Sequence, residues 1–594
     1  MRTLKSSCKA FALFVRLSKF YLFDSFYTVL RQLVITVIPI YLINEIVKLI
    51  TEGKGFHEIL KIIIIVGIIY ILFALGDVIE QYLSSKYSIV VKTKVNISLF
   101  KKLNTIDYKN HEDNKFLNKY TLAVDQSYDF LNRSYYSVVN FIGSIVSSIY
   151  LLSVLFQVHY FISIYAFLVA IIYFIVQSIV VELIYESNET QQPNFRERAY
   201  VRRTFYLKDH IEDIKSTDVD EILLEINDTV GNRITKNCDN YFRRRVKYNF
   251  FCDFLINSIF IVAVIFLVYQ TIHGNTDKAI FAGLVYASLS LSNFISRFIN
   301  SLSGIQYSAK YTKYYFDVMD IKGSIEEHGD VIAEPLNTIT INNVDFSYDT
   351  NKNALSNIDL EIKKGEKIAI VGHNGAGKTT LVKLLLRLYD PTKGEITYND
   401  HAYTKINPKS IREKIGAVFQ NFQIYAVSIA ENILLRPVES EEDERLVHEA
   451  LEFSGLKRHV DLLPNGIYTE VTKEFEKEGT IFSGGQRQKL ALSRVYAQNY
   501  DLIVLDEPSS ALDPLAEHEI HENMFKLGKN KMLIFISHRL STTIKADKIY
   551  LFEGGQLVEE GSHKELMKIE NGKYKYMFEV QAKNYLDDGG NKDA

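Results

Sequence analysis

Six runs of predominantly apolar residues occupy the first half of the sequence, and each is close to the roughly 20 residues that a helix needs to cross a hydrocarbon layer. A water-soluble core has little room for so many near-continuous apolar runs of this length. The pattern therefore predicts an α-helical membrane domain of six spanning helices. The runs are residues 26–49, 60–79, 138–158, 161–181, 254–272 and 279–298.

The connections between these runs differ greatly in length. Short loops join the first run to the second, the third to the fourth and the fifth to the sixth, whereas residues 81–133 and 182–249 are long and mix charges with apolar residues at helical spacing. Within these long segments, lysines and arginines such as Lys101 and Lys102 follow the second run, and others such as Arg243 precede the fifth. This asymmetry predicts that the N-terminus, the long segments and everything after the sixth run are cytoplasmic, with the spanning helices continuing into the cytoplasm as hairpins.

Charged residues near the ends of the predicted spans allow two interpretations. Ionisable groups at mid-membrane would mark a transport pathway, whereas groups at the boundary simply extend to the polar interface, which is the simpler explanation. Polar residues inside the runs fit either a lined cavity or bonds between helices, and the sequence leaves both open. The charged residues are Arg31, Asp77, Glu80, Asp253 and Arg297, and the polar ones Asn140, Gln177, Asn257, Ser288, Ser290, Ser292 and Asn293.

Charge and cysteine content exclude two classes of function. With 68 Lys and Arg against 71 Asp and Glu, the chain has a net charge of -3, so no basic excess indicates a nucleic-acid partner. Its three cysteines show neither metal-ligand spacing nor a paired framework. We therefore expect ordinary reduced or buried thiols.

Residues 372–379 read Gly-His-Asn-Gly-Ala-Gly-Lys-Thr, which fits the phosphate-binding pattern G-x-x-x-x-G-K-[ST]. An apolar strand is predicted just before this phosphate loop and a helix just after it. The glycines let backbone N–H groups converge on phosphate oxygens, the lysine reaches the terminal phosphates, and the threonine hydroxyl can ligate Mg²⁺. The chain is therefore expected to bind a nucleoside triphosphate through Gly372, Asn374, Gly375, Gly377, Lys378, Thr379 and Thr380.

Further strands are predicted at residues 338–346, 358–362, 501–507 and 532–536, and their alternation with helices favours a largely parallel sheet. Asp506 ends one apolar strand, where it is placed to hold Mg²⁺. Glu507, one residue later, is placed to polarise the attacking water. His538 follows another strand and could donate to the γ-phosphate, and Tyr348 could stack on adenine.

Taken together, these motifs resemble the nucleotide-binding domain of ATP-binding cassette transporters from about residue 338 to 580. Residues 482–486, Phe-Ser-Gly-Gly-Gln, look like the family's signature sequence. The resemblance implies that Gln420 contacts Mg²⁺ and takes part in catalysis with Glu507 and His538. It also implies that Asp513 lies in the dimer-contact loop. The signature residues implied to bind nucleotide are Ser483, Gly484, Gly485 and Gln486.

With six spans ahead of this domain, the chain is similar to exporter half-transporters. That resemblance implies two chains that clamp two ATP molecules between the phosphate loop of one and the signature of the other, and short coupling helices near residues 106–118 and 207–215. Two positions depart from the family's pattern. Phe482 replaces the usual leucine, and residues 476–479, Glu-Lys-Glu-Gly, stand where exporters usually carry a Gly-Glu-Arg-Gly-like run.

The resulting hypothesis is a multi-pass exporter of the cell membrane, driven by ATP and Mg²⁺, that works as a homodimer or with an unlike partner chain. We expect a transmembrane domain at 1–320, a linker at 321–337, an ABC nucleotide-binding domain at 338–582 and a polar tail at 583–594. The cargo would be a peptide, a lipid or an amphipathic drug, carried between the membrane halves of the two chains, with membrane lipid as a further partner. The alternative is an ATP-gated channel or regulatory membrane subunit that does not pump, although Glu507 favours turnover.

Overall fold

The computed structural model describes residues 2–158, 160–273, 278–325, 329–348, 352–473, 475–507, 514–528, 530–537 and 539–587. The chain forms two compact units. The first comprises the residues up to Asn104 together with Lys115–Ile321, and the second comprises Thr105–Asn114 together with the chain from Lys322 onward. The second unit therefore includes a ten-residue excursion from the helical half as well as the C-terminal half.

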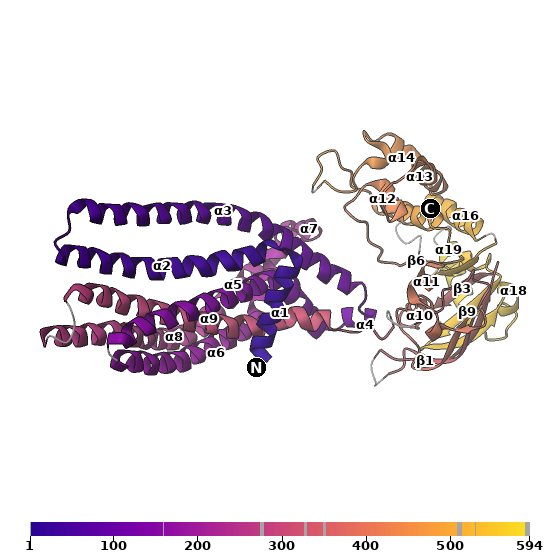
Figure 1. The fold of residues 1–594 in the computed structure, drawn as a ribbon. Coiled ribbons are helices and arrows are strands. Elements are labelled where there is room, and N and C mark those ends of the chain that lie inside the picture. The colour runs from indigo at the N-terminus through magenta and orange to yellow at the C-terminus, as the bar shows by residue number, and fades with distance from the viewer. Residues whose placement is uncertain are drawn as a thin grey trace. The chain divides into compact units, whose positions relative to one another are not determined.

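Long helices make up almost all of the described part of the first unit (Figure 1). Several are far longer than a membrane requires. With 54 residues and a rise of about 1.5 Å per residue, α8 extends about 80 Å, against the ~30 Å of a hydrocarbon layer. The expected extension of the helices beyond the spans is therefore observed. The helices are α1 Arg2–Leu17, α2 Phe20–Thr51, α3 Phe56–Leu103, α5 Asn114–Val158, α6 Tyr160–Thr204, α7 Lys208–Ser216, α8 Val219–Ile272 and α9 Lys278–Met319.

Within the described residues, five helices are long and apolar enough to cross a membrane: α2, α3, α5, α6 and α8. The sixth predicted span lies in α9, which is not among the five. By length and composition, five of the six predicted spans are therefore helices that could cross a membrane, and the sixth stays a prediction.

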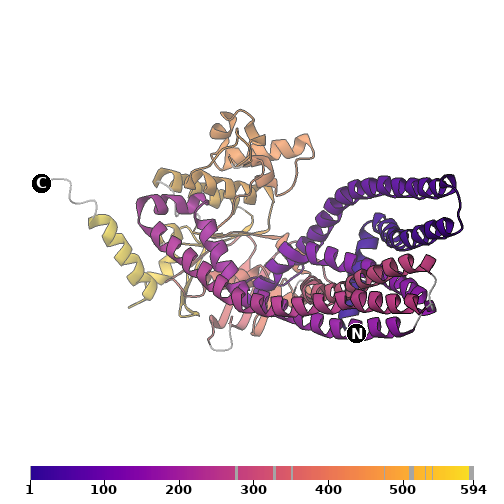
Figure 2. The same ribbon diagram turned by 90° about the vertical axis from the view of Figure 1, so that its left-hand side faces the viewer.

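Apolar side chains face outward along the spanning helices. On α3, for example, Ile64, Ile71 and Leu72 are each more than half exposed. Contiguous exposed apolar surface of this kind marks contact with lipid in a membrane protein. Buried residues of α5, α6, α8 and α9 pack into a common core. In Figures 1 and 2, α2 and α3 form an antiparallel hairpin beside these helices.

The second unit is an α/β structure built on two sheets. The first is antiparallel, with strand order β2-β1-β4-β5, and the second has the order β10-β9-β3-β8-β7-β6, parallel from β9 to β6 with β10 antiparallel at its edge. The strands are β1 Thr338–Phe346, β2 Leu355–Lys363, β3 Lys367–Gly372, β4 Lys393–Tyr398, β5 His401–Ala402, β6 Ile415–Val418, β7 Leu502–Asp506, β8 Met532–Ile536, β9 Lys548–Glu553 and β10 Gln556–Gly561.

Central strands of the parallel sheet read as continuous apolar runs because both of their faces are covered. Every residue of β7 and β8 is buried, and β3 is buried from Ile368 onward. The helices and short 3-10 turns of this unit are α4 Tyr108–His111, α10 Lys378–Leu385, η1 Tyr403–Lys405, α11 Pro408–Arg412, α12 Ile429–Leu434, α13 Glu441–Phe453, α14 Lys457–Asp461, η2 Gly466–Tyr468, α15 Gly484–Ala497, α16 Pro514–Leu527, α17 Leu540–Thr543, α18 His563–Leu566 and α19 Lys573–Asp587.

Helices α12 to α15 form a lobe with its own apolar core, which includes Ile433, Leu451 and Leu490. Phe482, just before α15, is 5% exposed and belongs to this core. Its ring lies 5.8 Å from the imidazole of His459 in an edge-on arrangement. The bulky residue at this position is therefore accommodated by packing.

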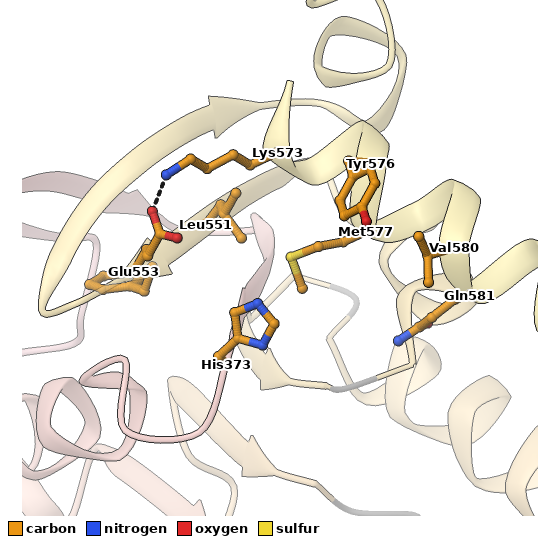
Figure 3. Close-up of a pocket in the computed structure, with 9 residues that line it drawn as sticks. His373, Leu551, Glu553, Lys573, Tyr576, Met577, Val580 and Gln581 are labelled. Carbon is orange, nitrogen blue, oxygen red and sulfur yellow. Dashed lines mark hydrogen bonds and ion pairs between the residues drawn. The ribbon is translucent and has the colours of Figure 1, made fainter. Parts of the chain in front are cut away.

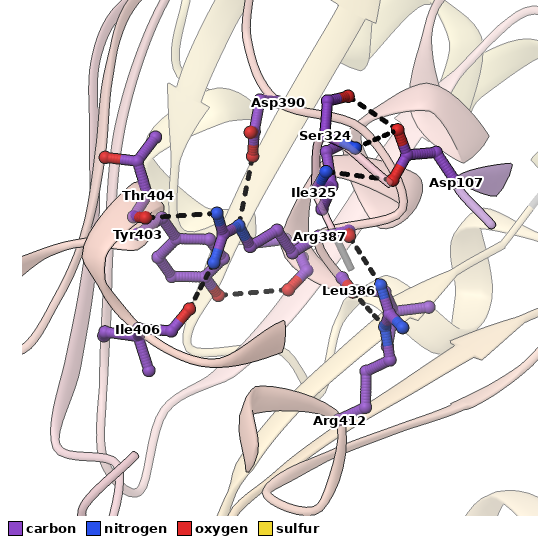
Figure 4. A network of polar contacts seen from close by, with 11 residues as sticks. Asp107, Ser324, Ile325, Leu386, Arg387, Asp390, Tyr403, Thr404, Ile406 and Arg412 are labelled. Atoms are coloured by element: carbon purple, nitrogen blue, oxygen red, sulfur yellow. Dashed lines mark hydrogen bonds and ion pairs between the residues drawn. The ribbon is translucent and has the colours of Figure 1, made fainter. Parts of the chain in front are cut away.

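A buried polar network secures the end of α10, the helix that follows the phosphate loop (Figure 4). The last carbonyls of a helix have no partner within it and need donors from elsewhere. Tyr403 donates its hydroxyl to the carbonyl of Leu385 at 3.0 Å. Arg412 donates to the carbonyls of the next two residues, at 3.0 and 2.7 Å. Arg387, 1% exposed, in turn donates to Asp390 at 3.1 Å. Together these bonds hold α10 in place.

Candidate nucleotide-binding site

The carboxyl ends of the parallel strands meet at one edge of the sheet, where they open on a cavity of about 550 Å³. The phosphate loop follows β3, Asp506 ends β7, and Gln420 comes two residues after β6. Ten of the predicted site residues line this one cavity: Tyr348, Asn374, Gly375, Gly377, Lys378, Thr379, Thr380, Gln420, Asp506 and Glu507. Residues that lie up to 159 positions apart in the sequence are thus brought to a single site.

Glycine is required at two turns of the phosphate loop. Gly372 has a φ of 147°, and a Cβ there would lie 2.2 Å from the backbone oxygen of Phe552 on the neighbouring strand. Gly377 has a φ of 100° and occupies the N-cap of α10 in the left-handed conformation. A Cβ at this position would meet Leu355 at 2.6 Å. The loop therefore takes a path that only glycine follows without strain.

Lys378 lies inside the loop that precedes it. Its ammonium group donates to the carbonyls of Gly372 and His373, at 2.7 and 3.0 Å, and the residue is 7% exposed. Burial lowers the pKa of Lys378, and the carboxylates of Glu507 and Asp506 oppose that shift. A phosphate group would supply the negative charge that this buried cation favours.

Two hydrogen bonds connect the remaining polar residues of the cavity. Thr379 donates its hydroxyl to Asp506 Oδ2 at 3.2 Å. Gln420 donates its amide to Glu507 Oε2 at 2.9 Å, which leaves Gln420 Oε1 as an acceptor. The two carboxylates therefore have different neighbours, since Asp506 accepts from a hydroxyl beside the phosphate loop and Glu507 accepts from the amide of a residue that follows β6.

Glu507 has a φ of 50°, which places its backbone in the left-handed region. Its N–H donates to the carbonyl of Ile536 on β8 at 3.1 Å. A residue with a side chain is strained in this conformation and persists there only because its surroundings hold it. The turn directs the chain out of the sheet immediately after β7 and brings this carboxylate to the cavity.

Tyr348 lies at the cavity's outer wall and is 44% exposed. Its hydroxyl is 3.1 Å from the hydroxyl of Thr380. The ring of Tyr389 meets it edge-on at 5.4 Å between centroids, and the ammonium of Lys383 lies 5.1 Å from its ring centroid. The aromatic side chain is therefore held in one orientation while part of its surface stays open.

The signature residues do not line this cavity. Ser483 caps α15, since its hydroxyl accepts from the N–H of Gln486 at 3.4 Å and the Gln486 side chain accepts from the N–H of Ser483 at 2.9 Å. This reciprocal capping box fixes the start of the helix. Ser483 and Gly484 are exposed beside it. Two other predicted site residues, Asp513 and His538, lie outside the described residues.

Six residues that line the cavity were not among the predicted ones: Lys352, Asn353, Ala354, Ala376, Gly554 and Gly555. The paired glycines after an apolar strand predict a turn in the sequence. They do not predict which part of the folded domain that turn contacts. The N–H of Gly555 donates to the carbonyl of Ala376 at 3.2 Å, so the turn after β9 braces the phosphate loop.

A second cavity, of about 390 Å³, lies between the phosphate loop, β9 and α19. Figure 3 shows His373 facing Met577 across it, with Lys573 paired to Glu553 at its rim. Apolar side chains such as Leu551 and Val580 supply much of its wall. This cavity lacks the cluster of donors that characterises the first one, so the nucleotide site is assigned to the first.

Several known proteins are similar in sequence to this chain. Residues 355–510 match the family model of the ABC transporter. The nisin transport ATP-binding protein NisT of Lactococcus lactis subsp. lactis is 29% identical over 531 residues, which cover 87% of this chain and 86% of NisT. The subtilin transport ATP-binding protein SpaT of Bacillus subtilis is 36% identical over 287 residues, which cover 47% of this chain and 46% of SpaT.

A solved structure of a bacterial Atm1-family ABC exporter with ATP bound shares the fold. It matches with a TM-score of 0.84 at 21% identity, over 95% of this chain and 98% of that one. The ATPase domain implies ATP binding, and the multiple apolar helices indicate a multi-pass membrane protein. The chain therefore joins a helical membrane region to a C-terminal α/β ABC ATPase domain, and it is homologous to ABC exporters.

Proposed function

We propose that this chain exports a peptide across the cytoplasmic membrane by coupling ATP binding and hydrolysis to alternating access. One observation carries the proposal: Lys378, Thr379, Gln420, Asp506 and Glu507 converge on one cavity in a chain that also carries five apolar spanning helices. The first group supplies what ATP hydrolysis needs, and the second provides a route for cargo. The N-terminus and the ATPase unit would lie in the cytoplasm.

The donors in the cavity fit Mg²⁺. This ion prefers oxygen ligands and usually keeps only one or two protein carboxylates together with phosphate oxygens and waters. Thr379 and Asp506 present a hydroxyl and a carboxylate 3.2 Å apart, and Gln420 offers its free amide oxygen. We assign these three residues as the magnesium ligands. The bound ion would neutralise charge on the phosphates.

We assign catalysis to Glu507, supported by Gln420 and His538. Glu507 would accept a proton from the attacking water, because its carboxylate is oriented by the amide of Gln420 at 2.9 Å. Lys378 would hold the β- and γ-phosphates through its buried ammonium group. Gly372, Asn374, Gly375, Gly377 and Thr380 would surround the phosphates, and Tyr348 would stack on adenine.

The working unit would contain two chains. Within the described residues, Ser483, Gly484, Gly485 and Gln486 are separate from the nucleotide cavity, so their contribution would be made to the nucleotide of a second chain, with Asp513 in the contact between chains. The start of the 14-residue α15 directs backbone N–H groups outward, which suits a phosphate. We favour a homodimer and keep an unlike partner chain as the alternative.

The peptide cargo is supported by the relatives. NisT and SpaT are, by name, transport proteins for nisin and subtilin. A lipid or an amphipathic drug is the alternative cargo. For the organisation of the chain we propose a transmembrane domain at 1–320, a linker at 321–337, the nucleotide-binding domain at 338–582 and a tail at 583–594.

ATP hydrolysis by the purified chain in lipid tests the proposed function. Wild type should turn over ATP, and Glu507→Gln should bind ATP yet lose turnover, because the amide cannot accept the proton. Glu413→Gln, at an exposed glutamate after α11, is the matched control and should keep the wild-type rate. Undiminished hydrolysis in Glu507→Gln would exclude the role assigned to this residue, and no turnover by wild type would exclude a self-sufficient homodimer.

A further inference from the structure

A polar cavity of about 460 Å³ lies within the helical unit, between α2, α5 and α9. Its lining includes Arg31 and Gln32 from α2, Asn140 and Ser144 from α5, and Arg297 and Asn300 from α9. The two arginines were expected simply to reach the membrane boundary. The structure instead brings both to the wall of one cavity, which is the arrangement that marks a pathway or ligand contact.

Glycines on the facing helices make room for this polar lining. A Cβ added to Gly143 on α5 would lie 2.1 Å from the amide oxygen of Gln32. A Cβ added to Gly304 on α9 would lie 2.5 Å from the hydroxyl of Ser137, which also lines the cavity. The helices therefore approach closely with polar groups between them, as small residues permit in membrane bundles.

The two arginines differ in their charge balance. Arg31 pairs with Asp77, whose carboxylate lies 2.8 Å from its Nε. Within the described residues, Arg297 has no ion-pair partner, and its guanidinium carbon lies 5.3 Å from the ring centroid of Phe294 on its own helix. Arginine stays charged in proteins. The cavity therefore carries one cation whose charge is not matched by a neighbouring carboxylate.

Some buried polar atoms at this site also have no hydrogen-bond partner among the described residues. Gln32 donates its amide N–H to Asn140 Oδ1 at 2.8 Å, which fixes both side chains. The amide oxygen of Gln32 and the hydroxyl of Ser144 are buried without a hydrogen-bond partner in the described part of the chain, and Ser144 is 0% exposed. Buried polar atoms are rarely left in this state unless a water or a ligand satisfies them.

A neighbouring cavity of about 380 Å³ provides a contrast. It is lined by α5, α6 and α9, and almost entirely by apolar side chains such as Ile149, Phe167 and Phe298. Helix α9 thus turns an apolar side to one cavity and a polar side to the other. Acyl chains suit the first lining, whereas the amides, hydroxyls and cation of the second suit a peptide backbone and a carboxylate.

We propose that the cavity between α2, α5 and α9 binds the exported peptide by a carboxylate group, which pairs with the guanidinium of Arg297 while Gln32, Asn140 and Ser144 bond the adjoining peptide amides. The proposal rests on the function proposed above and names the chemistry by which the cargo is held. An Arg–carboxylate pair with two parallel hydrogen bonds provides both charge and direction, so it would select the end of the cargo that carries the acid.

The test measures peptide binding to the full chain in phosphatidylcholine nanodiscs. The probe is a pool of nonapeptides without Asp or Glu, labelled with a neutral fluorophore, prepared once with a free C-terminal carboxylate and once as the amide. Wild type should bind the free-acid pool about tenfold more tightly than the amidated pool, as expected for a charge-assisted hydrogen bond. Arg297→Gln should reduce this ratio to about one, and Arg297→Lys should keep part of it.

Arg243→Gln is the matched control, because Arg243 is an exposed arginine of α8 that pairs with Asp239 and does not line the cavity. It should keep the wild-type ratio. Equal binding of both pools by wild type, no binding of the free-acid pool, or an unchanged ratio in Arg297→Gln would overturn the proposal. Loss of the ratio in discs that contain phosphatidylglycerol would identify a lipid phosphate as the occupant and would also overturn it.

The ATPase measurement without peptide keeps the two proposals apart. If wild type hydrolyses ATP and Glu507→Gln does not, while the two peptide pools bind equally, only the carboxylate site fails. If wild type shows no hydrolysis, the self-sufficient homodimer fails, whatever the peptides do. The unfolding temperature of each arginine variant shows whether a lost ratio reflects the site or a lost fold.

Discussion

The nucleotide cavity and the polar cavity of the helical unit differ in how fully their charged and polar groups are paired. In the nucleotide cavity, Lys378 donates to two carbonyls, and Gln420 donates to Glu507. In the membrane cavity, Arg297 has no ion-pair partner and Ser144 no hydrogen bond among the described residues. The first arrangement is pre-organised for one ligand of fixed shape. The second retains a charge and polar groups that a ligand could still pair with, as the proposed site for a variable cargo requires.

The two cavities also differ in what their glycines face. Gly372 approaches a backbone carbonyl of β9, which cannot move without disturbing the sheet. Gly143 approaches the end of a glutamine side chain, which can rotate away. The nucleotide site is therefore shaped by main chain, and the membrane site by side chains. We therefore expect substitutions in the nucleotide site to be strongly destabilising, and substitutions in the membrane site to be accommodated by movement of side chains.

Removal of Lys378 should have the largest effect. Lys378→Ala takes away the one cation that the phosphate loop surrounds, and the loss of a preorganised charge at a phosphate should lower ATP turnover on the order of 1000-fold. The measurement is ATP hydrolysis in lipid, with nucleotide binding followed separately. Lys409→Ala, on α11 and outside the nucleotide cavity, is the control. A variant that kept a tenth of the wild-type rate would contradict the role of Lys378.

Gly372→Ala should destabilise the ATPase unit by about 3 kcal/mol, because a strained backbone and a clash with main chain add together. The thermal unfolding of the purified chain reports this change. Gly375→Ala provides the comparison, since its φ of 77° is also strained but no atom lies within 4 Å of the added Cβ. It should be less destabilising. Equal effects of the two variants would show that the contact with β9 contributes nothing.

Gly143→Ala should have a smaller effect, of about 1 kcal/mol, which corresponds to the loss of the hydrogen bond between Gln32 and Asn140 as the amide rotates away. Gly67→Ala on α3 is the matched control, because nothing lies within 4 Å of a Cβ there. It should be neutral or slightly stabilising, since alanine favours helix over glycine. A cost for Gly143→Ala as large as that of Gly372→Ala would remove the distinction between the two cavities.

Glu112→Gln should have the smallest effect. Glu112 accepts from Lys383 at 2.8 Å and from the hydroxyl of Tyr389. A half-exposed pair of this kind contributes roughly 0.5–1 kcal/mol. Hydrogen–deuterium exchange over residues 105–114 should therefore rise about two- to fivefold. Glu58→Gln, at a solvent-exposed pair with Lys61, should leave that exchange unchanged.

The same contact predicts a pH dependence. Burial opposes ionisation of Glu112, but the hydrogen bonds from Lys383 and Tyr389 outweigh it, so its pKa lies below the ordinary value. The ion pair therefore stabilises the segment above the ordinary carboxyl pKa. This stabilisation is lost as the pH falls through the lowered pKa. Exchange in Glu112→Gln should accordingly be less sensitive to acid than exchange in wild type, and equal sensitivity would contradict the assignment.

Contiguous patterns made the nucleotide site predictable. The phosphate loop, β1, β8 and α10 lie where the sequence indicated, because strand burial and helical periodicity are local properties. Lys352 and Gly555 also reach the cavity, through turns whose positions depend on the sheet as a whole. The strained φ of Glu507 follows from its bond to β8, so no local pattern reveals it. The roles of the site residues, Asp513 and His538 included, stay predictions.

The membrane site was less predictable. Arg31 and Arg297 are 266 positions apart, and only the packing of α2 beside α9 brings them to one cavity. Hydropathy gave five of the six spans, because a long apolar run is recognised by composition alone. From α9, Arg297, Asn300 and Ser301 line the polar cavity. The composition of a helix gives the number of its polar residues, whereas the direction in which they face depends on how the helices pack.

The hydrogen bonds that Asp107 accepts hold together two segments that are far apart in the sequence. This residue is 2% exposed and accepts from the N–H groups of Ser324 and Ile325, at 2.7 and 2.9 Å (Figure 4). The chain passes between the two units near residues 104, 114 and 321, so one carboxylate ties the first of these crossings to the last. A domain that is joined to its neighbour through a single chain segment can rotate freely about that segment. Here, the segment that follows α3 and the segment that follows α9 are bonded to each other inside the second unit, so neither can move there without the other.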